Sequence, residues 1–182
     1  MRQDNKKALQ VMLDAALFTA FAAIISIIES FIFPTGLFLP GVKLGLSNIA
    51  TAAAFYLSGT VCAFFTAFLR PLFIFVFTGN VFSLCLSMCG SLLSFASLII
   101  SKPLYGKRIS FIGVSALSAL FHSIGQSIAG GILTSGTAFA LYFPLFAAAS
   151  VISGDICGVV MNTVLPRLSA AFGRTKGTEK AL

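Results

Sequence analysis

Charged residues are scarce in this sequence. Lysine, arginine, aspartate and glutamate make up 9% of its 182 residues, whereas a soluble domain carries roughly 25%. Hydrophobic residues make up 58%, and the mean hydropathy is +1.01. A soluble fold of this size has too much surface to stay in water with so few charges. The solvent for most of this chain must therefore be lipid.

Motifs for catalysis and nucleotide binding are also missing. The sequence contains no HExxH, no GxSxG, no phosphate-binding loop and no CxxC. Cys85 and Cys89 are one helical turn apart, but no histidine or acid lies nearby to complete a metal site. A magnesium-dependent diphosphate enzyme needs clustered carboxylates, and none occur here. The sequence therefore predicts no catalytic residue, no metal and no cofactor, so active transport would draw its energy from another subunit or an ion gradient.

Apolar stretches separated by turn signals predict six transmembrane helices. They are expected at residues 11–33, 45–58, 61–78, 81–100, 109–133 and 138–165. The second is short for a crossing, and the longest irregular connection between spans, PTGLFLPGVKLG, precedes it. The expected fold is an all-α integral membrane bundle of six helices. It divides the chain into a cytoplasmic segment at 1–10, a membrane domain at 11–167 and a basic cytoplasmic tail at 168–182.

Basic residues favour one side of this predicted bundle. Six crossings leave only Lys43 on the side opposite the termini. The side of the termini carries ten: Arg2, Lys6, Lys7, Lys102, Lys107, Arg108, Arg167, Arg174, Lys176 and Lys180. Because basic loops stay inside, both termini are expected in the cytoplasm. The basic residues behind the formal charge of +7 then set the orientation in the membrane and contact anionic lipids. No basic helix face with interleaved aromatics indicates a nucleic-acid partner.

Ionisable residues inside the predicted spans are costly in lipid and usually face a cavity or a partner. At ~1.5 Å per residue, Arg70, His122 and Asp155 are expected near one level on three different helices. They indicate a polar cavity or coupling network, or an Arg70–Asp155 ion pair that pins two helices together, and both interpretations can hold. Glu29, near the outer end of the first span, is interpreted as interfacial.

Other polar residues are candidates for binding a solute. His122 and Gln126 are four residues apart and share a helix face, where they contact a ligand or form hydrogen bonds between packed helices. Lys43 and Asn48 flank the end of the irregular connection and are placed to meet a polar solute from outside. The alternative for Asn48, shared with Ser47, is that it caps the second helix.

Small residues are spaced four apart in two of the spans. Ala16-x-x-x-Ala20 lies in the first span, and Gly154-x-x-x-Gly158 lies in the last. Such spacing lets another helix backbone approach closely. Each pattern is therefore a candidate helix contact.

Four segments resemble a known family. They are PGVKLGLSNIATAAAFYLSG (40–59), FLRPLF around Arg70, SLCLSMCGSLLS (83–94) and IGVSALSALFHSIGQ (112–126). Together they resemble small bacterial membrane proteins known as heptaprenyl diphosphate synthase component I, or the Gx transporter family, over roughly residues 10–165. This family is grouped with the substrate-binding S components of energy-coupling-factor vitamin transporters, which have six helices.

The resemblance implies a six-helix subunit of the bacterial cytoplasmic membrane that binds a small solute and is powered by a separate coupling module. In S components an Ala-x-x-x-Ala patch docks on the transmembrane coupling subunit, which works with ATPases, so Ala16 and Ala20 are the expected docking residues. The expected pocket residues favour an anionic or hydrogen-bond-rich solute: Lys43, Asn48, Arg70, His122 and Gln126. The alternative is a non-catalytic accessory subunit of polyprenyl diphosphate synthesis, since the aspartate-rich diphosphate motif is absent.

Overall fold

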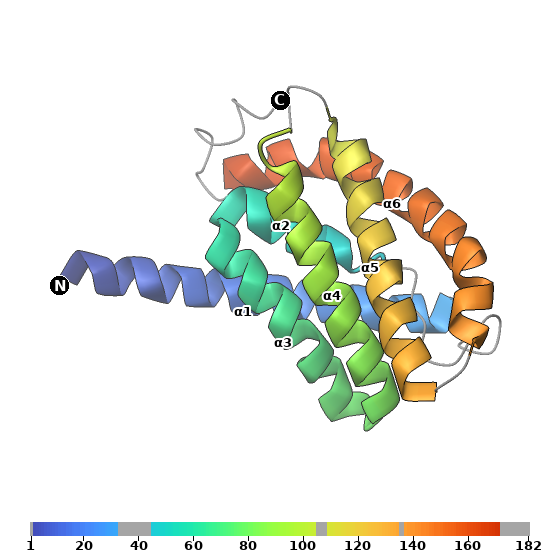
Figure 1. Ribbon diagram of the computed structural model, residues 1–182. Helices are drawn as coiled ribbons and strands as arrows, with labels where there is room; N and C mark the ends of the chain where they lie inside the picture. The colour runs from blue at the N-terminus through green and yellow to red at the C-terminus, as the bar shows by residue number, and fades with distance from the viewer. Residues whose placement is uncertain (1, 33–44, 105–108, 135–136, 172–182) are drawn as a thin grey trace.

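The computed structural model describes residues 2–32, 45–104, 109–134 and 137–171, and these residues form six α-helices (Figure 1). The helices are α1 (Arg2–Ile32), α2 (Asn48–Ser58), α3 (Thr60–Thr78), α4 (Val81–Ser101), α5 (Phe111–Thr134) and α6 (Ala138–Ala171). Five of them, all except α2, are long and apolar enough to cross a membrane. The chain is therefore an all-helical, membrane-embedded protein over its described residues, as its composition predicts.

The second predicted span is the one that differs from expectation. α2 has 11 residues, about 16 Å of helix, which is roughly half of the hydrocarbon thickness. The six helices are present, but only five have the length of a full span. Two other helices are longer than predicted, because α1 begins at Arg2 and α6 continues through Pro166 to Ala171.

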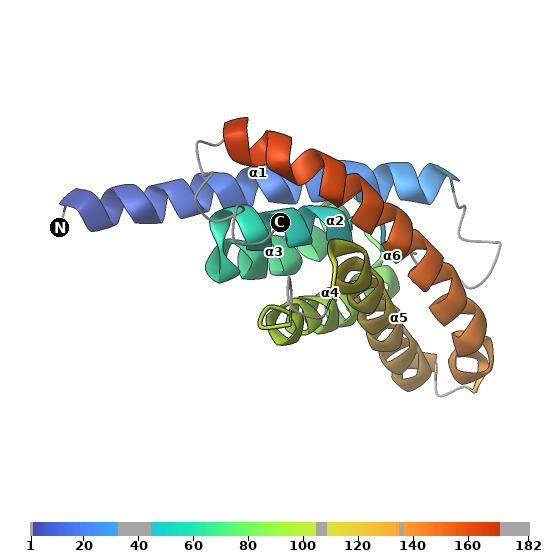
Figure 2. The ribbon, with the colours of Figure 1, turned by 90° about the horizontal axis from the view of Figure 1, so that it is seen from above.

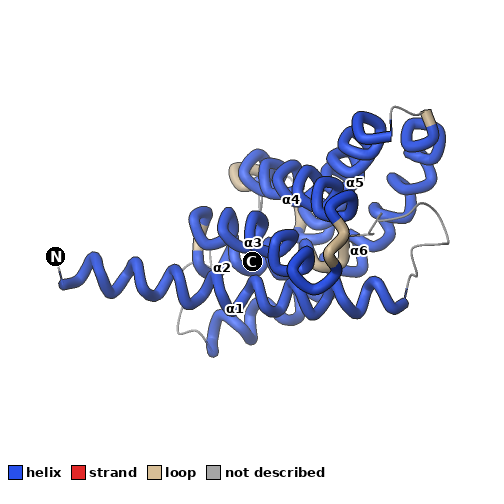
Figure 3. Tube along the Cα trace, turned by 90° about the horizontal axis from the view of Figure 1, so that it is seen from below, coloured by secondary structure: helices blue, strands red, loops and turns tan. Residues whose placement is uncertain are grey.

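Helices α3 to α6 run alternately up and down, with the α3–α4 and α5–α6 connections at one end of the bundle (Figure 1). α1 crosses them and packs against α2 and α3. Seen from above, α1 and the C-terminal half of α6 lie on one side of α2, and α4 lies on the other (Figure 2). The view from below shows the same enclosure of α2 by longer helices (Figure 3). α2 contacts all five other helices.

The start of α2 lies deep inside the bundle. Gly45, with a φ of 87°, opens a turn in which the Asn48 amide donates to the Gly45 carbonyl at 2.9 Å. The side chain of Asn48 meets Arg70, which lies near the middle of α3. α2 then runs back to Gly59, where α3 begins. Irregular backbone at membrane depth is tolerated only where protein or a cavity covers it, and here the surrounding helices cover it.

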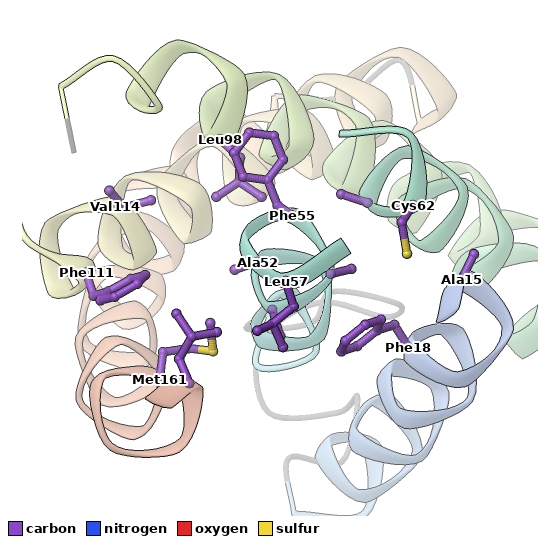
Figure 4. Packing of buried hydrophobic residues seen from close by; sticks show 14 residues of the cluster. Ala15, Phe18, Ala52, Phe55, Leu57, Cys62, Leu98, Phe111, Val114 and Met161 are labelled. Carbon is purple, nitrogen blue, oxygen red and sulfur yellow. The ribbon is translucent and has the colours of Figure 1, made fainter. Parts of the chain in front are cut away.

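Alanines allow the other helices to approach α2 closely. Its sequence NIATAAAFYLS buries three consecutive alanines, from Ala52 to Ala54. They belong to the main apolar core, which Figure 4 shows around α2. The neighbouring helices contribute larger side chains to this core: Phe18 from α1, Leu98 from α4, Val114 from α5 and Met161 from α6.

Glycines allow α4, α5 and α6 to approach one another closely. A Cβ at Gly125 of α5 would lie 2.6 Å from the Cys89 carbonyl oxygen of α4, and a Cβ at Gly158 of α6 would lie 2.5 Å from Ile112 Cα. Gly154 packs against Ala116 in the same way, with a would-be Cβ 2.7 Å from its Cα. The Gly154-x-x-x-Gly158 pattern is thus a helix contact, and its neighbour is α5 of the same chain.

Candidate functional site

Polar side chains from α1 to α5 converge on the turn that precedes α2. The residues that form this central cluster are all 6% exposed or less: Glu29, Ser47, Asn48, Arg70, Ser91, His122 and Gln126. α6 reaches the same turn, because the Cys157 thiol donates to the Leu46 carbonyl at 3.7 Å. Arg70, Ser91 and His122 each lie near the middle of their helices. The cluster is therefore a polar interior within an otherwise apolar bundle.

Arg70 is the cation of the cluster, and its side chain is 2% exposed. Its Nη1 donates to Ser47 Oγ at 2.8 Å and to Asn48 Oδ1 at 3.0 Å. Its Nη2 donates to Ser91 Oγ. A guanidinium has five N–H groups, so these bonds leave two donors without a partner among the described residues. The charge is held in a fixed position by neutral acceptors and can still receive a further acceptor.

The predicted ion pair between Arg70 and Asp155 is not observed among the described residues. Asp155 lies on the exposed side of α6, away from the buried guanidinium. Its neighbour Gly154 packs against Ala116, which is six residues, about 9 Å, before His122 on α5. Asp155 and His122 therefore do not share a level either. The structure thus brings Arg70 and His122 into one cluster and places Asp155 at another level and on the exposed side of α6.

Glu29 is the acid that the structure brings to the cluster. Its side chain is 2% exposed, so it is buried rather than interfacial. Glu29 Oε1 accepts a hydrogen bond from the Gly45 amide at 2.8 Å, and its carboxylate interacts electrostatically with Arg70. The acid on α1 and the base on α3 thus hold the turn before α2 from two sides.

His122 fits between two glycines. A Cβ at Gly90 of α4 would lie 2.7 Å from His122 Nδ1, and a Cβ at Gly45 would lie 3.2 Å from His122 Cδ2. The Gln126 amide donates from Nε2 to Nε2 of His122 at 3.1 Å. In the neutral ring this bond leaves the proton on Nδ1. The glycines thus make room for an imidazole that touches both α4 and the turn before α2.

Four of the five predicted binding residues meet in this cluster: Asn48, Arg70, His122 and Gln126. The fifth, Lys43, lies outside the described residues. The alternative of a helix cap is not observed, since Ser47 makes no side-chain cap on α2 and instead accepts from Arg70.

Sequence reasoning missed three members of the cluster: Glu29, Ser47 and Ser91. A signal for Ser91 existed in α4, where buried serines recur every three or four residues at 87, 91, 94, 97 and 101. Glu29 gave no comparable signal, because its burial depends on how α1 crosses the bundle.

Ala16 and Ala20 lie on an exposed part of α1. They border a groove of about 350 Å³ between α1 and α3, which Leu69, Leu72 and Val76 line from the other side. Thr19 also lines this groove, and its hydroxyl is buried and has no hydrogen-bond partner among the described residues. The predicted docking pair is therefore accessible to another helix.

An apolar cleft lies between α1 and α6. No described residues of these two helices have Cα atoms within 8 Å of one another, and α2 forms the floor of the gap. The cleft has a volume of about 240 Å³ and is lined only by apolar residues: Leu17, Phe18, Phe21, Ile25, Ile49, Ala50, Ala53, Met161, Val164 and Leu168. It can accept a hydrocarbon chain.

The fold and the cluster define a helical membrane protein with a buried polar centre and with no group of three or more potential metal ligands among its described residues. The chain belongs to the family described as heptaprenyl diphosphate synthase component I, whose model matches residues 18–164. That range contains every residue of the central cluster. No curated protein and no solved structure matches the chain.

Proposed function

We propose that this protein is a membrane-embedded substrate-binding subunit that takes up a small anionic or hydrogen-bonding solute, powered by a separate coupling module. The observation that carries the proposal is Arg70. It is a buried cation with two donors to spare, held at the start of a half-length helix. Ionisable groups within spans are expensive and mark ligand or ion pathways. Transporters place discontinuous helices of this kind at their binding sites.

The chemistry of the cluster favours a solute with an acidic group. The Arg70 guanidinium binds planar oxyanions through paired donors. The buried amide nitrogen of Asn48 has no hydrogen-bond partner among the described residues, and His122 adds an imidazole beside it. Each of these groups offers donors, whereas Glu29 neutralises part of the positive charge of Arg70. A monoanion with several hydrogen-bonding groups matches this set better than a highly charged ion.

The docking pair supports a coupling partner. Ala16 and Ala20 border an open groove, and small residues on an exposed helix face allow a partner helix to pack closely in lipid. Thr19, which lies between the two alanines in the sequence, lines the same groove. In this proposal a transmembrane coupling subunit occupies the groove and connects the protein to ATPases.

Native mass spectrometry of the full-length protein in mild detergent tests the solute site. We expect the wild type to carry a bound polar metabolite with an acidic group. Arg70→Gln should lose it, whereas Arg167→Gln should keep it, because Arg167 is exposed near the end of α6. An equal adduct in both variants, or no adduct in the wild type, contradicts the proposal. If Arg70→Gln fails to fold, Gln126→Leu replaces it.

A second function has support from the family and from the cleft between α1 and α6. In this function the chain is the non-catalytic membrane component of a heptaprenyl diphosphate synthase, and the apolar cleft holds a prenyl chain. Purification from native membranes separates the two functions. A tightly held synthase subunit together with an empty central cluster favours this second function, and Ala53→Phe, which narrows the cleft, should then weaken prenyl retention without affecting a polar solute.

The proposed setting is the bacterial cytoplasmic membrane with both termini in the cytoplasm. It follows from the ten basic residues on the side of the termini and the tendency of such residues to stay inside. A reporter that functions only in the cytoplasm should be active when fused after Leu182 and inactive when inserted at Thr137, in the α5–α6 connection. The reverse pattern would overturn this orientation.

A further inference from the structure

Asp155 is a carboxylate on the outer surface of a membrane helix. It lies at the centre of α6 (Ala138–Ala171), within the apolar stretch Phe139–Ala170. Its side chain is exposed, and it makes no hydrogen bond or ion pair with any residue that the structure describes. Its surface neighbours Ile152 and Ile156 are 62% and 56% exposed. The carboxylate therefore projects from a surface that is otherwise suited to lipid.

The depth of Asp155 follows from the contact between α6 and α5. Gly154 packs against Ala116, which lies five residues, about 8 Å, beyond the start of α5. Asp155 lies sixteen residues, about 24 Å, from the nearer end of α6, and aspartate lacks the long side chain with which lysine or arginine reaches toward a membrane surface. A charged group at this depth is costly in hydrocarbon and occurs where it is paired or faces water.

Asp155 belongs to a continuous exposed seam along α6. The seam follows the three- and four-residue spacing of one helix face and consists of Leu141, Leu145, Ala148, Ile152, Asp155, Val159 and Asn162. Asn162, seven residues after Asp155, adds a second polar group on the same face. A helix that packs along such a seam meets these residues in turn. The seam therefore presents one charge and one amide, about 10 Å apart, to whatever covers it.

We infer that this seam on α6 binds a transmembrane helix of a different protein, and that the helix carries a lysine or arginine opposite Asp155. Charge complementarity selects this occupant. Among its described residues a second copy of the chain supplies no such cation, because Arg70 is buried. The other basic residues described lie near helix ends: Arg2, Lys6, Lys7, Lys102 and Arg167. Lipid alone leaves the carboxylate without a counter-charge. The seam lies on α6, whereas the groove beside Ala16 lies between α1 and α3, so the two surfaces are distinct.

Site-specific photo-crosslinking in intact cells tests the seam. A photoreactive residue replaces Val159 on the seam, or Ile132 on α5 as the matched control, since both are well exposed at 55% and 73%. We expect a heterologous protein adduct from position 159 only. The adduct should fall at least fivefold in Asp155→Asn and persist in Asp155→Glu. The captured protein should contain a basic residue within an apolar helix.

A charge exchange then decides the pairing. Asp155→Lys should abolish the adduct, and an aspartate in place of the partner's basic residue should restore it. An adduct at twice the chain mass, no protein adduct from position 159, or an adduct that Asp155→Asn leaves unchanged would overturn the inference. Solute binding is measured separately on the purified chain, so its failure would be distinguishable from failure of the seam.

Discussion

Arg70 and Asp155 are both charged residues within apolar helices, but their surroundings are opposite. Arg70 is buried, and acceptors from the turn before α2 and from α4 hold its guanidinium. Asp155 is exposed and has no such partner in the described part of the chain. The described chain therefore supplies acceptors to its inner charge and no partner to its outer charge. In the proposals above, the buried charge serves folding and solute binding, and the exposed charge serves binding of another protein.

The largest effect is expected from Arg70→Ala. The change removes three hydrogen bonds, leaves Ser47, Asn48 and Ser91 without their donor, and removes a cation that interacts with Glu29. Breaking one side of a buried charged network costs about 3 kcal/mol. Unfolding of the detergent-solubilised protein by denaturant should show a loss of that order, with Arg167→Ala as control. If Arg70→Ala and Arg167→Ala have the same free energy of unfolding, Arg70 does not stabilise the fold.

A smaller loss of stability is expected from a change at Gly125, where α5 contacts α4 beside the central cluster. Gly125 lies between His122 and Gln126 in the sequence of α5, and a Cβ there would lie 2.6 Å from the Cys89 carbonyl oxygen. Overpacking of this kind costs about 1–3 kcal/mol. Gly125→Ala should therefore lower the free energy of unfolding and weaken solute binding.

Gly131 provides the matched control for Gly125. It lies on the same helix, but a Cβ there would meet nothing within 4 Å. Because alanine is favoured over glycine in a helix by about 0.5–1 kcal/mol, Gly131→Ala should be neutral or slightly stabilising. If the two substitutions behave alike, the close approach of α4 and α5 is not what positions His122.

The helices were predictable from sequence because their ends carry strong signals. Gly59, Gly79 and the polar SKPLYGKR segment interrupt apolar runs whose lengths match a membrane span. The predicted range 81–100 differs by only one residue from α4 (Val81–Ser101). α2 was placed correctly but is not a full crossing, because nothing in its composition shows that its first residues lie halfway through the bundle.

The candidate site was only partly predictable, because the sequence does not show how each helix is rotated about its own axis. Sequence gives the distance of a residue along a helix, but the direction of its side chain depends on the neighbouring helices. Arg70 and His122 face inward, whereas Asp155 faces outward because Gly154 and Gly158 bring the other side of α6 against α5. Glu29 reaches the centre only because of the way α1 crosses the bundle.

A smaller effect is expected from a single hydrogen bond between two uncharged side chains in the interior. Ser94 of α4 and Ser118 of α5 share a hydrogen bond of 2.6 Å. Hydrogen bonds between membrane helices contribute about 0.6 kcal/mol on average. Ser94→Ala should lose about that amount, and a double-mutant cycle with Ser118→Ala should recover the same coupling energy. A coupling energy near zero would mean that the serines of α4 serve only to keep the helices close.

The smallest effect on folding, and the sharpest test of the comparison, is expected from Asp155→Leu. The carboxylate has no partner within the described chain, so the purified protein should keep its free energy of unfolding within about 0.5 kcal/mol, as surface substitutions usually do. In detergent the variant should also retain its bound solute, because the central cluster is unchanged. In cells, however, it should lose the crosslink from position 159. Loss of stability in the isolated chain would instead show that Asp155 supports its own fold, and the distinction between an inner charge for folding and an outer charge for assembly would fail.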